Sequence, residues 1–144
     1  MKYDSDFNKD LNFGKEAEAL TLKTLKQKYP KAYIKKGYNK EYDIVVPELD
    51  NQTIEVKYDR QTDGPDKHTG NLFVECESRG RKSGIETTTA NWYFYYYNNL
   101  NKLVRIETNS LKKLIKENNF RKVNGGDSQT SKGYLIPVKL FVEK

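Results

Sequence analysis

The sequence predicts a mixed α/β domain, in which an N-terminal helix precedes a series of short strands, and a second helix and a last strand follow. Three observations support this fold class. Apolar residues recur at helical spacing over residues 11–29, segments rich in β-branched and aromatic residues follow between residues 43 and 107, and 144 residues suit one domain. We therefore expect a single domain over residues 1–144, built on a mixed β-sheet flanked by helices.

The helix predicted over residues 11–29 has one charge on its apolar stripe. The stripe is formed by Leu11, Leu22, Leu25 and Tyr29. Glu18 lies on the same stripe, four residues before Leu22. Burial of a carboxylate costs free energy unless it has a partner, so Glu18 is a candidate functional residue. The alternative is a carboxylate at the rim of the stripe that reaches water.

Seven strand segments are predicted after this helix, which ends at Pro30 because the residue before a proline avoids the helical conformation. They cover residues 32–35, 43–46, 53–58, 72–77, 93–97, 103–107 and 134–142. Residues 47–51 predict a hairpin turn between the second and third segments. Two further helices are expected, over residues 87–92 with a threonine cap and over residues 110–118 with Ser110 or Thr108 as the cap. Residues 60–70, 78–85 and 124–133 are expected to be loops.

The composition favours an intracellular protein with a polyanionic partner. The formal net charge is +6 and the pI is about 9.2. Cys76 is the only cysteine, which excludes an intramolecular disulfide and fits a reducing, cytoplasmic location. The N-terminus lacks the apolar core of a signal peptide, and no apolar run is long enough for a transmembrane helix. We therefore expect nucleic acid, and no membrane, as the partner.

The predicted hairpin brings charged residues together. Glu55 and Lys57 share one face of their strand, because side chains two positions apart point the same way. A short hairpin brings Asp43 close to one of them. Two adjacent carboxylates repel each other unless a cation lies between them, and Mg²⁺ prefers carboxylate and water oxygens. Such an ion polarises a phosphate and lowers the pKa of a bound water, while a nearby ammonium orients that water or neutralises developing charge.

A simpler interpretation is a half-exposed strand whose polar face alternates glutamate and lysine. Charged residues make up 32% of the chain, so Glu55-x-Lys57 has little weight by itself. Its context adds weight, because it lies on one of two apolar strands joined by a turn, and Glu18 precedes both strands on a helix.

In this arrangement the sequence resembles the PD-(D/E)XK nuclease superfamily, in particular compact phage-type endonucleases and Holliday-junction resolvases. The matching motifs are G-x-x-x-E over residues 14–18, Glu41-Tyr42-Asp43, and Ile54-Glu55-Val56-Lys57. The resemblance covers about residues 14–97 and includes the Ser-Gly-Ile segment over residues 83–85. Tyr42 stands where the superfamily has its name-giving proline, a residue that many members lack.

The resemblance implies a restriction-endonuclease-like core and a metal-dependent DNA endonuclease that hydrolyses phosphodiester bonds, with branched DNA junctions as one candidate substrate. Asp43, Glu55 and the Val56 carbonyl would bind Mg²⁺, for which Mn²⁺ would substitute. Lys57 would position or activate the attacking water, and Glu18 would be a further acidic ligand. The family also implies a homodimer, in which symmetry coordinates two cuts.

Several residues near the predicted site are candidates for substrate contact. Phosphates dominate the affinity for nucleic acid, and a helix start offers free backbone N–H groups. The candidates are Glu75, Arg79, Arg81, Lys82, Ser83, Thr87 and Thr88. The alternatives are an exposed strand carboxylate, a solvated basic loop and an ordinary helix cap. His68, the only histidine, fits a surface loop better than a catalytic role.

Two other functions stay open on the sequence alone. One is a catalytically inactive nucleic-acid-binding module with the same fold. The other is a protein-interaction domain whose charged strand face is merely solvated.

Overall fold

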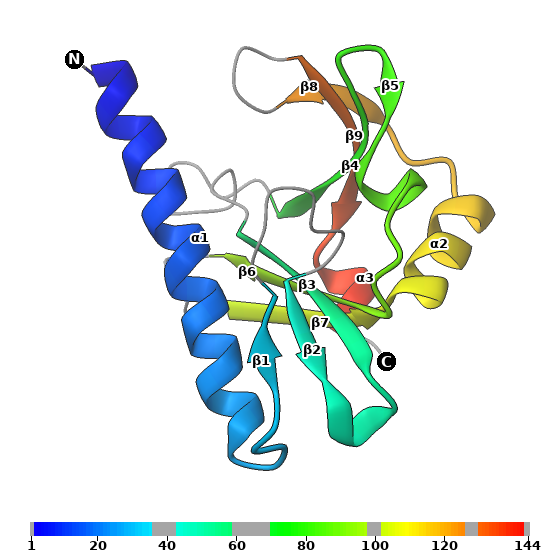
Figure 1. Ribbon diagram of the computed structural model, residues 1–144. Coiled ribbons are helices and arrows are strands. Elements are labelled where there is room, and N and C mark those ends of the chain that lie inside the picture. The colour runs from blue at the N-terminus through cyan, green and yellow to red at the C-terminus, as the bar shows by residue number, and fades with distance from the viewer. Residues whose placement is uncertain (1, 36–42, 59–69, 98–101, 126–129, 143–144) are drawn as a thin grey trace.

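The computed structural model describes residues 2–35, 43–58, 70–97, 102–125 and 130–142, and for residues 2–13 and 142 it describes the backbone alone. Over these ranges the chain forms two β-sheets and three α-helices (Figure 1). The helices are α1 (Lys2–Lys26), α2 (Thr108–Glu117) and α3 (Lys139–Val142). No helix in the ranges above is both long enough and apolar enough to cross a membrane.

The first sheet has five strands in the order β1-β2-β3-β6-β7. They span Tyr33–Ile34, Ile44–Val46, Gln52–Tyr58, Trp92–Tyr97 and Lys102–Glu107. β3 and β6 are parallel, whereas the other neighbours are antiparallel. The 3₁₀ turn η1 (Pro47–Leu49) and two left-handed residues, Asp50 and Asn51, close the predicted hairpin between β2 and β3. The predicted fold class, a mixed sheet flanked by helices, is confirmed.

The second sheet was not predicted as a separate unit. It has the order β5-β4-β9-β8 and antiparallel pairs throughout. Its strands are β4 (Asn71–Ser78), β5 (Arg81–Lys82), β8 (Lys122–Gly125) and β9 (Ser131–Pro137). The last strand is shorter than the predicted residues 134–142, because Pro137 has no N–H to continue the ladder and α3 follows. The predicted loops over residues 78–85 and 124–133 contain β5 and parts of β8 and β9.

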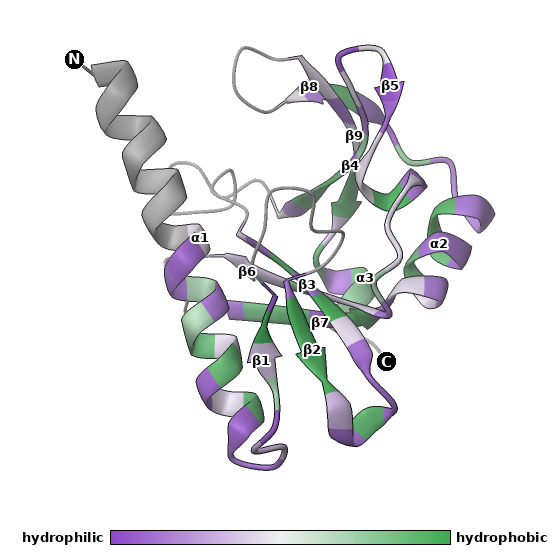
Figure 2. Ribbon diagram, viewed as in Figure 1, coloured by the Kyte–Doolittle hydropathy of each residue, from purple (hydrophilic) through white to green (hydrophobic). Residues whose placement is uncertain are grey.

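Strand β6 separates two apolar cores. Tyr93, Tyr95 and Tyr97 point into the core between the sheets, which also contains Leu72, Val74, Leu111 and Ile136. Phe94 and Tyr96 point to the opposite face, where they form a second core with Ile44, Ile54 and Ala17 of α1. Successive side chains of a strand point to opposite faces, so this aromatic run supplies both cores. Hydrophobic residues line β2, whereas β5 is hydrophilic (Figure 2).

The helix predicted over residues 87–92 is wrong. The 3₁₀ turn η3 (Gly84–Glu86) precedes this segment, and β6 begins at Trp92. The Asn91 N–H donates to the Thr53 carbonyl at 2.9 Å, and the Thr53 N–H donates to Asn91 Oδ1 at 2.8 Å. These bonds hold the segment against the start of β3, so tertiary contacts override the local helix signal.

The two longer helices differ from their predicted bounds. α1 begins at Lys2 and ends at Lys26, three residues before Tyr29. α2 begins at Thr108, and its N-cap is Glu107, which makes no side-chain capping bond. The predicted cap by Thr108 or Ser110 is therefore wrong, because β7 runs directly into α2 and makes both residues part of the first turn.

Candidate functional site

Asp43 directly precedes β2, and its backbone does not follow the regular ladder. Its N–H donates to the Ile54 carbonyl, and its own carbonyl accepts from the Lys35 N–H, both at 2.9 Å. In a regular antiparallel strand the two groups of one residue face the same neighbour. Here they face opposite neighbours, and the 9% exposed side chain turns toward β3. Asp43 Oδ2 accepts from the Val56 N–H at 2.7 Å.

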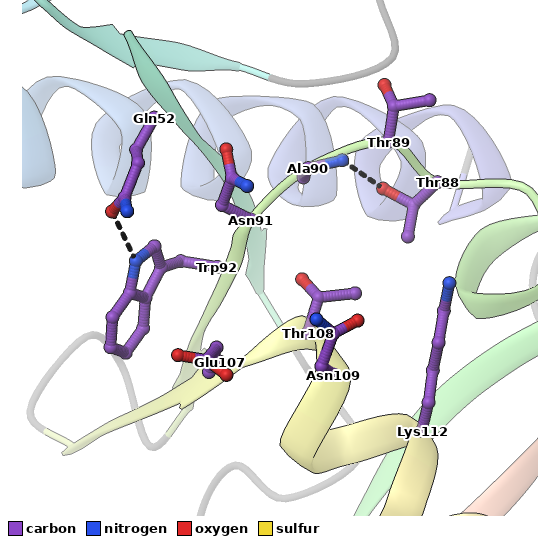
Figure 3. A pocket seen from close by; sticks show the side chains of 10 residues that line it. All are labelled: Gln52, Thr88, Thr89, Ala90, Asn91, Trp92, Glu107, Thr108, Asn109 and Lys112. Atoms are coloured by element: carbon purple, nitrogen blue, oxygen red, sulfur yellow. Dashed lines mark hydrogen bonds between the residues drawn. The ribbon is translucent and has the colours of Figure 1, made fainter. Parts of the chain in front are cut away.

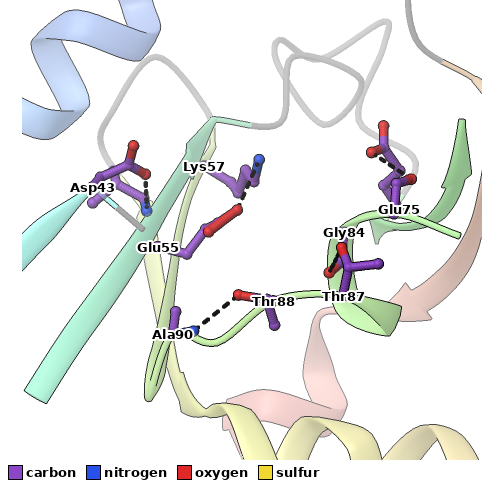
Figure 4. Close-up of polar contacts among 10 residues, drawn as sticks. Asp43, Glu55, Lys57, Glu75, Gly84, Thr87, Thr88 and Ala90 are labelled. Atoms are coloured by element: carbon purple, nitrogen blue, oxygen red, sulfur yellow. Dashed lines mark hydrogen bonds and ion pairs between the residues drawn. The ribbon is translucent and has the colours of Figure 1, made fainter. Parts of the chain in front are cut away.

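Glu55 and Lys57 share one face of β3, as the sequence predicts. The structure adds that this face points toward the second sheet, since their partners Tyr93 and Tyr95 lie in the core between the sheets. The Lys57 Nζ is 3.2 Å from Glu55 Oε1. The Glu55 side chain is 14% exposed and that of Lys57 46%, so the pair lies at the rim of the core. Figure 4 shows the pair on one side of β3 and Asp43 at the β2 edge of the same strand.

Val56 links these side chains through its backbone. Its N–H donates to Asp43, and its side chain is buried against α1 on the face opposite Glu55 and Lys57. In a β-strand the N–H and C=O of one residue point to the same edge. The Val56 carbonyl therefore faces the edge at which Asp43 lies, which suits its predicted role as a backbone ligand.

Tyr93 adds a buried hydroxyl that the sequence did not single out. It is 1% exposed and lies beside Glu55 in the parallel register of β3 and β6. Its hydroxyl has no hydrogen-bond partner of standard geometry in the described part of the chain. Burial raises the pKa of Tyr93 far above its ordinary value, and the charges of Glu55, Glu75 and Asp43 raise it further, while the Thr88 side chain lowers it. All three carboxylates therefore act on this hydroxyl.

Glu75 comes from the second sheet and approaches the same space. Its Oε2 accepts from the Ser83 hydroxyl at 2.9 Å, and its side chain is half-buried. Gly84, at φ +55°, lies so close to the Glu75 backbone that a Cβ there would overlap the carbonyl. Figure 4 shows Glu75 across from Glu55 and Lys57, with Thr88 between the two sides. Glu75 and Ser83 thus bind each other at one wall of the site.

Glu18 is half-buried on α1, close in the chain to two residues that are almost fully buried. Those residues are Ala17 and Thr21, and the Thr21 hydroxyl bonds the Tyr96 hydroxyl at 2.7 Å. Within the described ranges no three His, Cys, Asp or Glu side chains gather closely enough to hold a metal ion. Glu18, Asp43 and Glu55 are thus not one preformed cluster of three ligands.

The residues predicted to contact the substrate differ in their exposure and in their hydrogen bonds. Arg79, Arg81 and Lys82 are exposed on the β4–β5 hairpin, whose two-residue turn has Arg79 at φ +51° and Gly80 at φ +78°. The N–H groups of Thr87 and Thr88 donate to the Gly84 carbonyl at 3.1 and 2.9 Å. The prediction that these threonines open a helix with free N–H groups is therefore wrong. His68 lies outside the described residues.

Comparisons with models of known families, with curated proteins and with solved structures found no match. The superfamily resemblance therefore stays a prediction from the sequence motifs.

Proposed function

We propose that this protein is a metal-dependent DNA endonuclease that hydrolyses phosphodiester bonds. The observation that supports it best is the 2.7 Å bond between Asp43 Oδ2 and the Val56 N–H. This bond connects Asp43 to the peptide group between Glu55 and Val56. Asp43 beside β3 and Glu55, the Val56 carbonyl and Lys57 on β3 thus supply two carboxylates, a backbone carbonyl and an ammonium, the groups that the sequence motif names.

The donors suit Mg²⁺, which takes oxygen ligands and retains several waters, so two carboxylates and one carbonyl are enough. Asp43, Glu55 and the Val56 carbonyl would hold the ion, and Mn²⁺ would substitute for it. When bound, the ion supplies a polarised phosphate and a water of lowered pKa. The fit has a further support in Tyr93, a buried hydroxyl that lies beside Glu55 in the strand register and lacks a regular partner among the described groups.

Lys57 is the residue that we expect to act on the reacting groups. Its ammonium now neutralises Glu55, and 46% of its side chain is exposed, so it can turn toward a bound phosphate. There it would orient the attacking water or neutralise the charge that develops on the phosphate oxygens. Glu75 would stay bound to Ser83 and shape the opposite wall.

The test is cleavage of plasmid DNA and of a four-way junction in Mg²⁺ or Mn²⁺. Asp43→Asn keeps an oxygen for the Val56 N–H but removes the charge, and it should lower cleavage at least about 100-fold. Asp50→Asn is the matched control, because Asp50 is an exposed carboxylate in the same hairpin with a left-handed backbone that asparagine tolerates. Equal cleavage activity of the two variants would show that Asp43 is not a residue of the catalytic site.

The second candidate function is a catalytically inactive nucleic-acid-binding module with the same fold. It is favoured by the ion pair of Glu55 with Lys57 and by the lack of a three-ligand cluster in the described ranges. Tight DNA binding without divalent ions, together with no cleavage in Mg²⁺, Mn²⁺ or Co²⁺, would select this function.

A further inference from the structure

A polar cavity of about 390 Å³ lies on the other side of Thr88 from the carboxylates. The start of α2 forms one wall, and the segment between η3 and β6 forms the other (Figure 3). The side chains that matter here are Thr88, Thr89, Glu107, Thr108, Asn109 and Lys112. Because Thr88 lines the cavity and also lies near Tyr93 and Glu55, the cavity adjoins the proposed catalytic centre.

The wall formed by α2 contains backbone N–H groups without a side-chain cap. β7 leads directly into the helix, and the N-cap residue Glu107 makes no side-chain capping bond. The Thr108 N–H donates to the Asn91 carbonyl at 2.9 Å. The next two N–H groups, of Asn109 and Ser110, are those that a cap normally satisfies. They are directed out of the helix start, where its dipole favours negative charge.

The Thr108 side chain independently indicates that a ligand binds at this wall of the cavity. It is 4% exposed, and in the described part of the chain its hydroxyl has no hydrogen-bond partner. Figure 3 shows this hydroxyl directed from α2 toward the segment that contains Ala90 and Asn91. Buried hydroxyls are nearly always satisfied, so an unsatisfied one in a cavity wall indicates a partner that binds there.

The charges around the cavity are separated. Figure 3 shows Lys112 beside Thr88 and Thr108, one turn into α2, whereas Glu107 lies on the other side near Trp92. The Lys112 ammonium adds to the positive charge of the helix dipole at the start of α2. This part of the cavity therefore suits an anion. Lys113, the next residue, is instead 3.9 Å from Glu117 and does not line the cavity.

We infer that the start of α2, with Thr108 and Lys112, binds a phosphate of the nucleic-acid backbone. This inference rests on the proposed function, because it takes the substrate to be nucleic acid. The phosphate would accept from the N–H groups of Asn109 and Ser110 and from the Thr108 hydroxyl, and Lys112 would neutralise its charge. It is a flanking phosphate, separated from the scissile one by the Thr88 wall, and it positions the strand.

The first test measures the affinity for a short DNA duplex without divalent ions over a range of salt concentrations. Lys112→Gln should weaken binding about tenfold and lower the slope of log K against log salt by about 0.9, as for one lost phosphate contact. Lys113→Gln makes the same charge change on the same helix and should have a clearly smaller effect. Equal effects of the two variants would overturn the inference.

A second test separates binding from folding. Thr108→Val removes a hydroxyl that has no partner in the described structure, so the Tm should stay equal or rise. At the same time, titration with inorganic phosphate, followed by the backbone amide signals of Asn109 and Ser110, should show weaker binding than in the natural protein. A lowered Tm, or unchanged phosphate shifts, would overturn the role of Thr108.

The two proposals fail separately. If the protein cleaves DNA and Lys112→Gln behaves like Lys113→Gln, the phosphate site is wrong and the nuclease stands. If the protein never cleaves but Lys112→Gln alone loses affinity, the phosphate site stands in a binding module.

Discussion

The two polar regions on either side of Thr88 differ in how their groups are satisfied. At the carboxylate site, formed by Asp43, Glu55 and Lys57, each carboxylate has an internal partner, the Val56 N–H or the Lys57 ammonium. At the α2 cavity, the helix start has no side-chain cap and the Thr108 hydroxyl has no partner among the described groups. The first region presents two carboxylates, whereas the second suits an anion, and the proposed nuclease would need both kinds of region.

The largest effect should come from removal of the ammonium at the carboxylate site. Lys57→Met keeps the length of the side chain and should lower cleavage at least about 100-fold, because the developing charge loses its stabilisation. Duplex affinity without metal should change much less. Lys102→Met, at an exposed position of β7 in the same sheet, is the control. Parallel losses of cleavage and affinity in Lys57→Met would make this lysine a simple phosphate contact.

Gly84, whose carbonyl accepts from the Thr87 and Thr88 N–H groups, gives the next largest effect. Gly84→Ala strains a backbone at φ +55° and also drives a Cβ into the Glu75 carbonyl, so we expect a loss of about 3 kcal/mol in the free energy of unfolding. Gly80→Ala has the same kind of strain at φ +78° but open space around its Cβ, and should cost about 1 kcal/mol. Denaturant unfolding measures both, and equal losses would show that the close approach to Glu75 is unimportant.

The smallest effects concern the hydroxyls of β6. Tyr96 bonds Thr21 at 2.7 Å, so Tyr96→Phe should cost about 1 kcal/mol. Tyr93→Phe removes a hydroxyl without a regular partner and should leave the free energy of unfolding equal or slightly higher. Urea unfolding at neutral pH distinguishes the two, and a loss in Tyr93→Phe as large as in Tyr96→Phe would mean that the Tyr93 hydroxyl is well bonded.

The same tyrosine predicts a pH dependence. Burial and nearby carboxylates raise the pKa of Tyr93 above its ordinary value of 10.0. The folded state therefore keeps the proton that the unfolded chain releases, and its stabilising contribution, complete below about pH 10, is lost as the pH rises further. The free energy of unfolding should fall less steeply in Tyr93→Phe than in the natural protein between pH 9 and about 11. Identical slopes would contradict the raised pKa.

The sequence predicted the parts of the molecule that local patterns determine. Alternation placed β3 and the shared face of Glu55 and Lys57, and the turn at residues 47–51 placed Asp43 beside β3, although β2 itself begins only at Ile44. The alternation of apolar and polar residues along a strand does not determine which strands pair. For this reason β4 and β9 were not predicted to form a second sheet. The local signal at Thr87–Trp92 failed because the bonds between Asn91 and Thr53 hold that segment extended.

The groups of the two candidate sites that were not predicted from the sequence depend on contacts between residues far apart in the chain. Tyr93 is one of several aromatic residues in β6, and only the register with Glu55 distinguishes it. The α2 cavity forms because β7 leads into α2 and places the start of this helix beside Thr88. The spacing of residues in the sequence does not predict that these two segments meet. The prediction of an anion site at Thr88 rested on the wrong helix, yet the structure places another helix start beside the same residue.

The most direct measurement is a crystal of the protein grown with Mn²⁺, in which anomalous scattering locates the ion. We expect a peak within ligand distance of Asp43, Glu55 and the Val56 carbonyl, and its loss in Asp43→Asn. An ion that binds elsewhere on the protein, or none at these residues at saturating Mn²⁺, would contradict the proposal that this site is a metal-dependent catalytic centre.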